Sequence, residues 1–348
     1  GGDSYLVWDA FKHNGAHNLV VIGAGARYNI VQSYLEDLPE GVYQPFDHIQ
    51  VFLVSTQEQA NSQLISQALR QPNTTVYFVG GDQTDYLDML WGTNRNNSFL
   101  TTINRLFSRK QLSFGGSSAG LAVQGDRAFR GPVVNSTGSR LLLDPNNVNN
   151  DASFGRYVSF EDDFLHLLGP ALARPVLTDT HFKERNRMAR FVAFLAQTQT
   201  VLDLKADLRL RLSWNGRMHG IAVDEGTALI VDVNFGIGMV MTTVRRSTDL
   251  PGYVFFGEAQ QGTQVQFPSG RLDTTKPVAI RRVGANYRFN LITWTPNNPV
   301  PSDLFKVQIT DGRAYSEGLL LSRDLYYNLS YLDMRLLKKQ DNNGELIL

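Results

Sequence analysis

The sequence contains no cysteine, and this absence removes several kinds of chemistry at once. Without thiols there is no disulfide framework, no thiolate zinc site and no cysteine nucleophile. Neither sign of charge is in excess, since 33 Lys and Arg balance 33 Asp and Glu. Proteins that bind nucleic acid normally carry a basic excess or stripe, so this balance argues against that function. No stretch approaches the roughly 18 apolar residues that would cross a bilayer.

The 348 residues, 42% of them apolar, are enough for one large domain or two modest ones with a buried core. The chain starts Gly1-Gly2-Asp3 without a methionine, so we expect a processed or trimmed product from which any signal segment has been removed. Localisation is left open between the cytoplasm and export after removal of a signal.

The first part of the chain alternates strand and helix signals. Short apolar runs cover residues 18–22, 49–54 and 75–79. Helical spacing of apolar residues covers 57–70, 87–91 and 99–107. Strands that alternate with amphipathic helices indicate a mostly parallel sheet covered on both faces. Such a sheet carries its functional loops at the carboxyl ends of its strands.

The later part of the chain changes character. Residues 132–153 are rich in Asn, Asp, Gly and Ser and are expected to form a long loop or lid. A strand at 175–179 and a helix at 183–196 follow. Strand-like runs then predominate, at 221–223, 228–231, 239–241, 278–280 and 287–289. We expect residues 1–245 to form an α/β domain. Residues 246–348 should form a β-rich extension of the sheet that is not clearly a separate domain.

The most informative segment is Gly115-Gly116-Ser117-Ser118-Ala119-Gly120, which places a serine between small residues after a strand at 111–114. A strand, a sharp turn and a helix in this order make a nucleophile elbow, because only small neighbours tolerate the strained turn around the serine. The free N–H groups of the following helix face any anion that forms beside the serine.

A nucleophilic serine needs a base, and the base needs an acid to orient it. His181 lies just past the strand at 175–179, where a parallel sheet presents catalytic groups. The arginines 185, 187 and 190 follow it and form either a solvated helix face or a carboxylate-binding group. His13 and His17 are expected at the surface, and His48 and His166 in packing or capping positions, while substitution of His219 is expected to have little effect.

Four motifs together resemble the cyanophycinase branch of the serine peptidases, which also contain aspartyl dipeptidase. They are the segments 78–83 (Phe-Val-Gly-Gly-Asp-Gln), 116–120 (Gly-Ser-Ser-Ala-Gly), 179–182 (Asp-Thr-His-Phe) with its three arginines, and 220–228 (Gly-Ile-Ala-Val-Asp-Glu-Gly-Thr-Ala). The resemblance implies a three-layer α/β/α sandwich like that of the class I glutamine amidotransferases. Those amidotransferases use a cysteine at the elbow, which this chain lacks.

The resemblance also implies roles for individual residues. Ser118 becomes the nucleophile, His181 the general base and Glu225 the acid. The backbone N–H groups of Gly81 and Ala119 become the oxyanion hole. The residues implied at the substrate site are Gln83, Asp179, Arg185, Arg187 and Arg190.

The acid is the open assignment, since other carboxylates lie near the motifs. Asp179 shares a strand face with His181 and is expected to fix the elbow loops or the substrate. Asp126 is expected to have a structural role, and Glu161 and Asp162 stay alternatives. The chain also departs from the family pattern: Thr180 replaces a glutamine, residues 205–209 are inserted before Glu225, and the turn at 23–25 reads Gly-Ala-Gly. These departures weaken the case for the cyanophycin polymer as substrate.

The sequence therefore predicts a serine exopeptidase that cleaves aspartyl or isoaspartyl (β-linked) peptides through an acyl-enzyme, without a metal or organic cofactor. The alternative is a binding protein that keeps the pocket without efficient turnover. The expected partner is a peptide substrate with an aspartyl residue. No nucleic acid or membrane span is expected, and a homodimer is left open.

Overall fold

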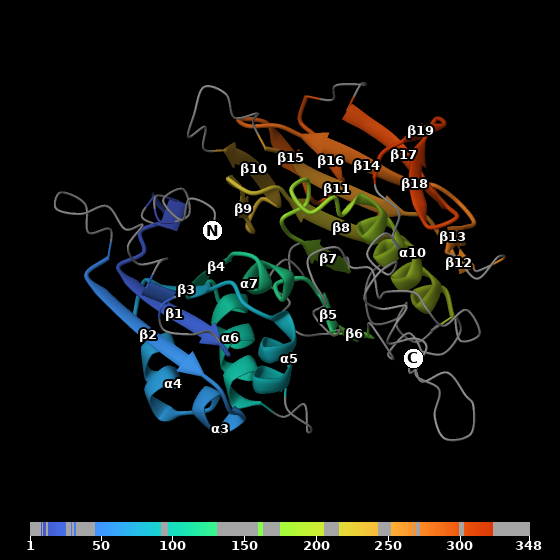
Figure 1. The fold of residues 1–348 in the computed structure, drawn as a ribbon. Helices are drawn as coiled ribbons and strands as arrows, with labels where there is room; N and C mark the ends of the chain where they lie inside the picture. Colours follow the sequence, from blue (N-terminus) through green and yellow to red (C-terminus); the bar gives the residue numbers. More distant parts are fainter. Residues whose placement is uncertain are drawn as a thin grey trace, which may run out of the picture.

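The computed structural model describes residues 8, 10–11, 13–25, 29, 31–32, 46–91, 97–130, 159–162, 175–204, 216–242, 252–266, 268, 272–298 and 303–322. The loop expected at 132–153, His166 and the insertion at 205–209 lie outside the described residues. The described chain is a mixed α/β structure in which two large sheets lie side by side (Figure 1).

The first sheet is parallel, as the alternation of strands and helices predicts. Its strand order is β2-β1-β3-β4. The strands are β1 (Asn18–Ala24), β2 (His48–Val54), β3 (Thr74–Phe78) and β4 (Leu112–Gly116).

The central strands β1 and β3 are buried on both faces, which explains why they read as continuous apolar runs, whereas the edge strand β2 is largely exposed. Val20 and Ile22 of β1 pack against the helices below the sheet, while Leu19 and Val21 face the opposite way. On that second face they meet Trp8 and Phe11, which belong to a helical segment near the start of the described chain. Successive strand residues alternate between faces, so each face gets half of the run.

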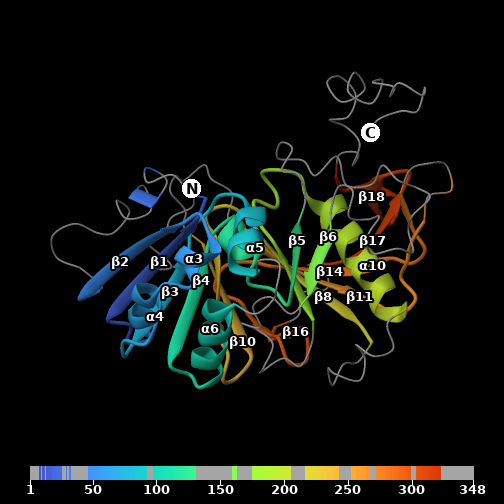
Figure 2. The ribbon, with the colours of Figure 1, turned by 90° about the horizontal axis from the view of Figure 1, so that it is seen from below.

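The helices of this half lie together on one side of the sheet (Figures 1 and 2). They are α3 (Gln57–Ala60), α4 (Gln63–Leu69), α5 (Gln83–Trp91) and α6 (Ser98–Ser108). The single helical stretch expected at 57–70 is two helices. The reason is local: Ser62 caps α4 by accepting a hydrogen bond from the N–H of Ile65.

The second large sheet has nine strands in the order β19-β18-β17-β14-β11-β8-β7-β5-β6. β5, β7 and β8 are parallel to one another, and the remaining pairs are antiparallel. The strands are β5 (Arg127–Arg130), β6 (Ser159–Asp162), β7 (Val176–Asp179), β8 (Met218–Val223), β11 (Val254–Ala259), β14 (Val278–Val283), β17 (Leu304–Thr310), β18 (Arg313–Ser316) and β19 (Leu319–Leu320).

Helix α10 (Met188–Leu204) packs on one face of the nine-stranded sheet, and a smaller sheet packs on the other. The smaller sheet has the order β16-β15-β10-β9. Its strands are β9 (Thr227–Asp232), β10 (Ile237–Thr242), β15 (Arg288–Asn290) and β16 (Thr295–Pro296), and a separate pair is formed by β12 (Val265–Gln266) and β13 (Asp273–Thr274).

This layering of helix, sheet and sheet does not confirm a three-layer α/β/α sandwich for the whole molecule. The boundary at 245/246 stays a prediction. β11 forms a ladder with β8, so strands from both sides of that boundary share one sheet.

The helix expected at 183–196 begins later, at Met188. Asn186 has a φ of 52°, which no α-helix accommodates, and residues 182–186 form turns. Among the described residues, no helix is long and apolar enough to cross a membrane.

Candidate active site

Ser118 lies at a sharp turn between β4 and the short helix α7 (Ala119–Ala122). Its φ of 50° and ψ of −119° are unusual for a residue with a side chain and mark backbone strain. The turn depends on Gly120, because a Cβ atom there would lie 2.0 Å from the carbonyl oxygen of Phe78. The local geometry is that of the expected elbow, with the serine half-buried at the carboxyl end of a parallel strand.

His181 approaches Ser118 from the turn that follows β7 of the other large sheet. Its Nε2 atom lies 2.7 Å from Oγ of Ser118. His181 also has a positive φ, 48°, so both members of this pair are held in strained backbone. The two sheets therefore meet at a hydroxyl–imidazole hydrogen bond.

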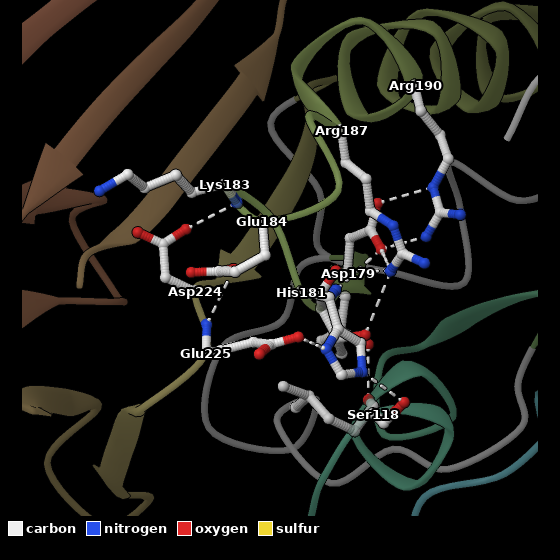
Figure 3. Close-up of polar contacts among 12 residues, drawn as sticks. Ser118, Asp179, His181, Lys183, Glu184, Arg187, Arg190, Asp224 and Glu225 are labelled. Atoms are coloured by element: carbon white, nitrogen blue, oxygen red, sulfur yellow. Dashed lines mark hydrogen bonds and ion pairs between the residues drawn. The ribbon is translucent and has the colours of Figure 1, made fainter. Parts of the chain in front are cut away.

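Glu225 completes a chain of three side chains (Figure 3). It lies in the turn between β8 and β9, and its Oε1 is 2.5 Å from Nδ1 of His181. The histidine side chain is 13% exposed and that of the glutamate 40% exposed. A carboxylate at Nδ1 favours the tautomer with its proton there, which leaves Nε2 free to accept the proton of the serine hydroxyl.

The pKa of His181 is lowered from its ordinary value of 6.5, chiefly because burial disfavours the charged imidazolium. The hydrogen bond to Glu225 acts in the opposite direction, and the positive charge of Arg185 lowers the pKa further. A neutral imidazole is the form that can accept a proton, so these surroundings suit a general base near neutral pH.

Two acids that the sequence left without a role hold the turns of His181 and Glu225 together. Oδ1 of Asp224 accepts a hydrogen bond from the N–H of Lys183 at 2.9 Å. Oδ2 of the same carboxylate accepts a hydrogen bond from the N–H of Tyr253, also at 2.9 Å. Oε2 of Glu184 accepts one from the N–H of Glu225 at 3.1 Å. Burial raises the pKa of Asp224 to about 6, against the effect of its two backbone donors. Asp224 belongs to the quoted motif at 220–228, a signal that could have identified it.

Asp179 lies behind His181 and is fully buried. Arg187 donates a hydrogen bond to its carboxylate at 3.2 Å, and Arg190 binds the same carboxylate through two nitrogens. Burial raises the pKa of Asp179, but the charges of Arg190 and Arg187 outweigh it and hold the pKa below its ordinary value. Arg190 also stacks over the ring of Phe129. These contacts form a closed internal cluster.

The remaining site residues of the sequence analysis lie in two places. Arg185 is half-buried near His181, and among the described residues no hydrogen-bond partner of its guanidinium is found. Gln83 is the first residue of α5, and Gly81 precedes it with a φ of 154°. Ala119 is the first residue of α7, so its N–H has no acceptor within the helix. No backbone acceptor for Gly81 N–H occurs in the part of the chain that the structure describes.

The alternative acids fall elsewhere. Asp126 is buried and accepts a hydrogen bond from the N–H of Val176 at 2.9 Å, which fits the structural role expected for it. Glu161 and Asp162 belong to β6, where the structure describes the backbone alone.

A cavity of about 460 Å³ opens beside Ser118 and His181. Its walls come mainly from residues 112–118 and 225–234, with Phe11 and Tyr77 at one side. Among the described residues that line it, Gly81, Gln83 and the three arginines do not occur. The described lining of this cavity therefore contains none of the five substrate residues that the family resemblance implies.

Comparison with known proteins agrees with the resemblance. Over 159 residues the chain is 24% identical to a cyanophycinase from Geminocystis herdmanii (strain PCC 6308), a match that covers 46% of this chain and 49% of the relative. The chain is similar to a cyanophycinase. It spans about half the length of the curated relative it matches.

Among solved structures, a peptidase from an acI-B1 Actinobacterium matches with a TM-score of 0.40 and 14% identity, over 89% of this chain and 88% of the other. No protein-family model matches the chain.

Proposed function

We propose that this protein is a serine-type peptidase in which Ser118, His181 and Glu225 form a catalytic triad. The observation that carries the proposal is the continuous line from Ser118 Oγ through both ring nitrogens of His181 to the Glu225 carboxylate. The similarity to a cyanophycinase supports the same conclusion. For the fold, we propose an α/β/α arrangement for the half of the molecule around β1–β4, whose sheet is covered on both faces.

In the proposed reaction, Ser118 Oγ attacks the scissile carbonyl carbon while His181 Nε2 takes the hydroxyl proton. Glu225 stabilises the resulting imidazolium. The imidazolium then gives its proton to the leaving amine as the C–N bond breaks, which leaves an acyl-serine. Water attacks the acyl-serine through the same base, and the serine regains its proton as the acid product leaves.

The oxyanion of each tetrahedral intermediate needs preorganised donors, and we propose the N–H groups of Ala119 and Gly81. Both are held by tight turns, so they need no reorganisation when negative charge develops. Loss of one such donor typically costs about 3–4 kcal/mol of transition-state stabilisation.

For the substrate, we propose aspartyl or isoaspartyl peptides cleaved at a chain end, without a metal or organic cofactor. Arg185 is the proposed carboxylate-binding residue, because it is near His181 and its guanidinium is available. Gln83 is proposed to line the same side of the site. For Arg187 and Arg190 we propose a positioning role through Asp179, since both guanidinium groups are buried against it.

A fluorophosphonate probe tests the mechanism directly, because it labels only an activated serine. We expect labelling of the wild-type protein and of Ser117→Ala, and none of Ser118→Ala. Peptide mapping then locates the label. Labelling of the Ser118→Ala variant would move the nucleophile elsewhere, and an unlabelled wild-type protein would favour a binding protein without turnover.

A further inference from the structure

Two strand edges face the same cavity beside Ser118. β4 is the last strand of the first sheet, and β9 is the last strand of the small sheet. Every residue of β4 lines the cavity, together with Ser117 and Ser118 of the elbow. Every residue of β9 also lines it, together with the turns at 225–226 and 233–234. Figure 1 shows β4 and β9 at the edges of their sheets, and the shared cavity places these two edges beside each other. Neither outer edge is bonded to the backbone of another described strand.

The outward hydrogen-bonding groups of β4 can be identified from its contacts with β3. The N–H of Ser117 donates to the carbonyl oxygen of Phe78 at 3.1 Å, so the N–H of Ser117 points toward β3. Backbone groups alternate in direction along a strand. Those of Gly116 and Phe114 therefore point away from β3, toward the cavity, and Gly116 lies two residues before the nucleophile.

The outward groups of β9 follow from its partner, β10. Val240 forms hydrogen bonds with Tyr287 and Asn286 on the β15 side, at 3.0 and 2.8 Å. Val240 lies opposite Leu229, so this pair exchanges no bonds across the β9–β10 ladder. The N–H and C=O groups of Leu229, and by alternation those of Val231, point outward from the edge.

The surface that lines the cavity is more apolar than polar, although polar side chains contribute to it throughout. Phe114 and Leu121 contribute to the lining on the side of β4 and the elbow, and Leu229 and Ile230 contribute to it on the side of β9. At the end away from Ser118 the wall includes Lys110 and Asp232. Outward backbone groups on two sides, with a largely apolar surface between them, are features that bind an extended peptide.

We propose that the cavity binds the peptide substrate as an extra β-strand between β4 and β9, with apolar or small side chains along the cleft. The proposal rests on the proposed serine peptidase function and names the part of the substrate that this site reads. β4 ends at the nucleophile and β9 starts at Glu225, so the bound strand leads away from the scissile bond toward Lys110 and Asp232. A strand along the five residues of β4 spans roughly 17 Å.

This cleft discriminates between linkages. In an α-linked peptide the N–H and C=O groups recur in register with both strand edges. A β-linked aspartyl residue inserts an additional backbone carbon and shifts every later group out of register. We therefore expect β-linkages to be accepted at the scissile bond and rejected along the cleft.

Binding to the Ser118→Ala variant tests the proposal without turnover. The probe is a fluorescein-labelled, α-linked hexapeptide of alternating valine and alanine that ends in aspartate. A second peptide with the reversed sequence is also prepared, so that both directions of the bound chain are tested. Replacing one amide by an ester removes a single N–H with little change in shape. We expect each ester along the cleft to weaken binding about three- to tenfold, measured by fluorescence anisotropy. Unchanged binding of every ester analogue would overturn strand addition.

A matched pair of variants tests the edge of β9. Val231→Ala keeps the outward N–H, whereas Val231→Pro removes it without loss of a ladder bond to β10. We expect the proline variant to bind the hexapeptide at least about threefold more weakly than the alanine variant, with Leu64→Ala on the exposed face of α4 as the unaffected control. Equal binding of the two Val231 variants, with native melting curves for both, would remove β9 from the proposal.

The two proposals can fail separately. If wild-type Ser118 resists the fluorophosphonate probe but the ester series behaves as expected, the peptide cleft stands and the serine mechanism falls. If Ser118 is labelled and the ester series shows no effect, the mechanism stands and the cleft is refuted.

Discussion

The N–H of Glu225 donates a hydrogen bond to Oε2 of Glu184 at 3.1 Å. Glu184 follows His181 by three positions, so the turn that carries the imidazole also holds the turn that carries its carboxylate partner. Asp224 adds a second bond between the same turns, to the N–H of Lys183. The alignment of His181 with Glu225 therefore depends on the Glu184 and Asp224 carboxylates, which hold the two turns together through backbone N–H groups.

Glu184→Ala should lower kcat by roughly tenfold and leave KM almost unchanged. The variant keeps every proposed triad residue but frees the Glu225 turn, and a misplacement of about 1 Å can cost about 10²-fold in rate. Glu184→Gln retains an oxygen that can accept the hydrogen bond and should restore most of the activity. An equal loss in both variants would show that the charge of Glu184 matters more than its bond.

His181→Ala should reduce turnover by several orders of magnitude, because the hydroxyl of Ser118 then has no base. Glu225→Gln should lower kcat/KM about 10²–10⁴-fold, because a neutral amide no longer selects the His181 tautomer that carries its proton on Nδ1. His17→Ala at the surface and Asp162→Asn serve as comparisons. The measurement is kcat/KM on one aspartyl peptide for all four variants. Similar losses in Glu225→Gln and Asp162→Asn would leave the acid unassigned.

The pH profile of kcat/KM should rise on its acid side with a midpoint below 6.5, the ordinary pKa of histidine. Burial lowers the pKa of His181, and protonation of the imidazole removes the base, so activity is lost as the pH falls through that lowered value. Glu225→Gln removes an interaction that raises the pKa, so its midpoint should lie lower still. A wild-type midpoint above 7 would contradict this reading.

Asp179→Asn should destabilise the fold by about 3–5 kcal/mol, because it leaves Arg187 and Arg190 buried without their counter-charge. Asp303→Asn, which removes the partner of the part-exposed Arg282, should cost about 1 kcal/mol or less. Urea unfolding measures both.

The sign of the pH dependence follows from the lowered pKa of Asp179. The carboxylate contributes stability above its ordinary value of 3.8, and that stability is lost as the pH falls through the still lower folded value. The gap between wild type and Asp179→Asn should therefore persist at pH 5. A gap that closes between pH 7 and 5 would contradict the pairing.

Arg185→Ala should reduce the preference for an aspartyl over an asparaginyl peptide by about one to two decades. A charge-assisted hydrogen bond contributes roughly 1.5–3 kcal/mol, and Arg185→Lys should recover only part of it because lysine lacks the planar fork. The wild-type protein should also cleave small aspartyl peptides better than insoluble cyanophycin granules, since Thr180 replaces the glutamine of the family pattern. Efficient granule degradation would refute this specificity.

The sequence predicts the first sheet well because local physics determines it. β1 and β3 are buried on both faces, so their apolar runs are unmistakable, and the small residues around Ser118 permit little besides a sharp turn. The spacing of apolar residues does not predict the start of α10 at Met188, because a single residue, Asn186, leaves the helical region. Pattern averages over many residues do not detect one backbone angle.

The environment of the arginines could not be predicted from spacing. Their spacing indicates that Arg187 and Arg190 can lie together, but not whether they face solvent or the buried Asp179. The ladder from β8 through β11 to β14 and β17 was equally hidden, because it joins residues far apart in the sequence. Long-range pairing depends on the whole fold.

Ser118 and His181 lie in turns that follow strands of different sheets, and the hydrogen bond from Thr178 Oγ1 of β7 to the carbonyl oxygen of Leu121 in α7 is another direct link near the site. A slight slide of one sheet past the other would separate hydroxyl from imidazole while both ladders stayed intact. On warming, turnover should therefore stop at a temperature below the melting temperature of the protein. The temperature at which turnover stops would then measure how strongly the contacts between the two sheets hold them in place.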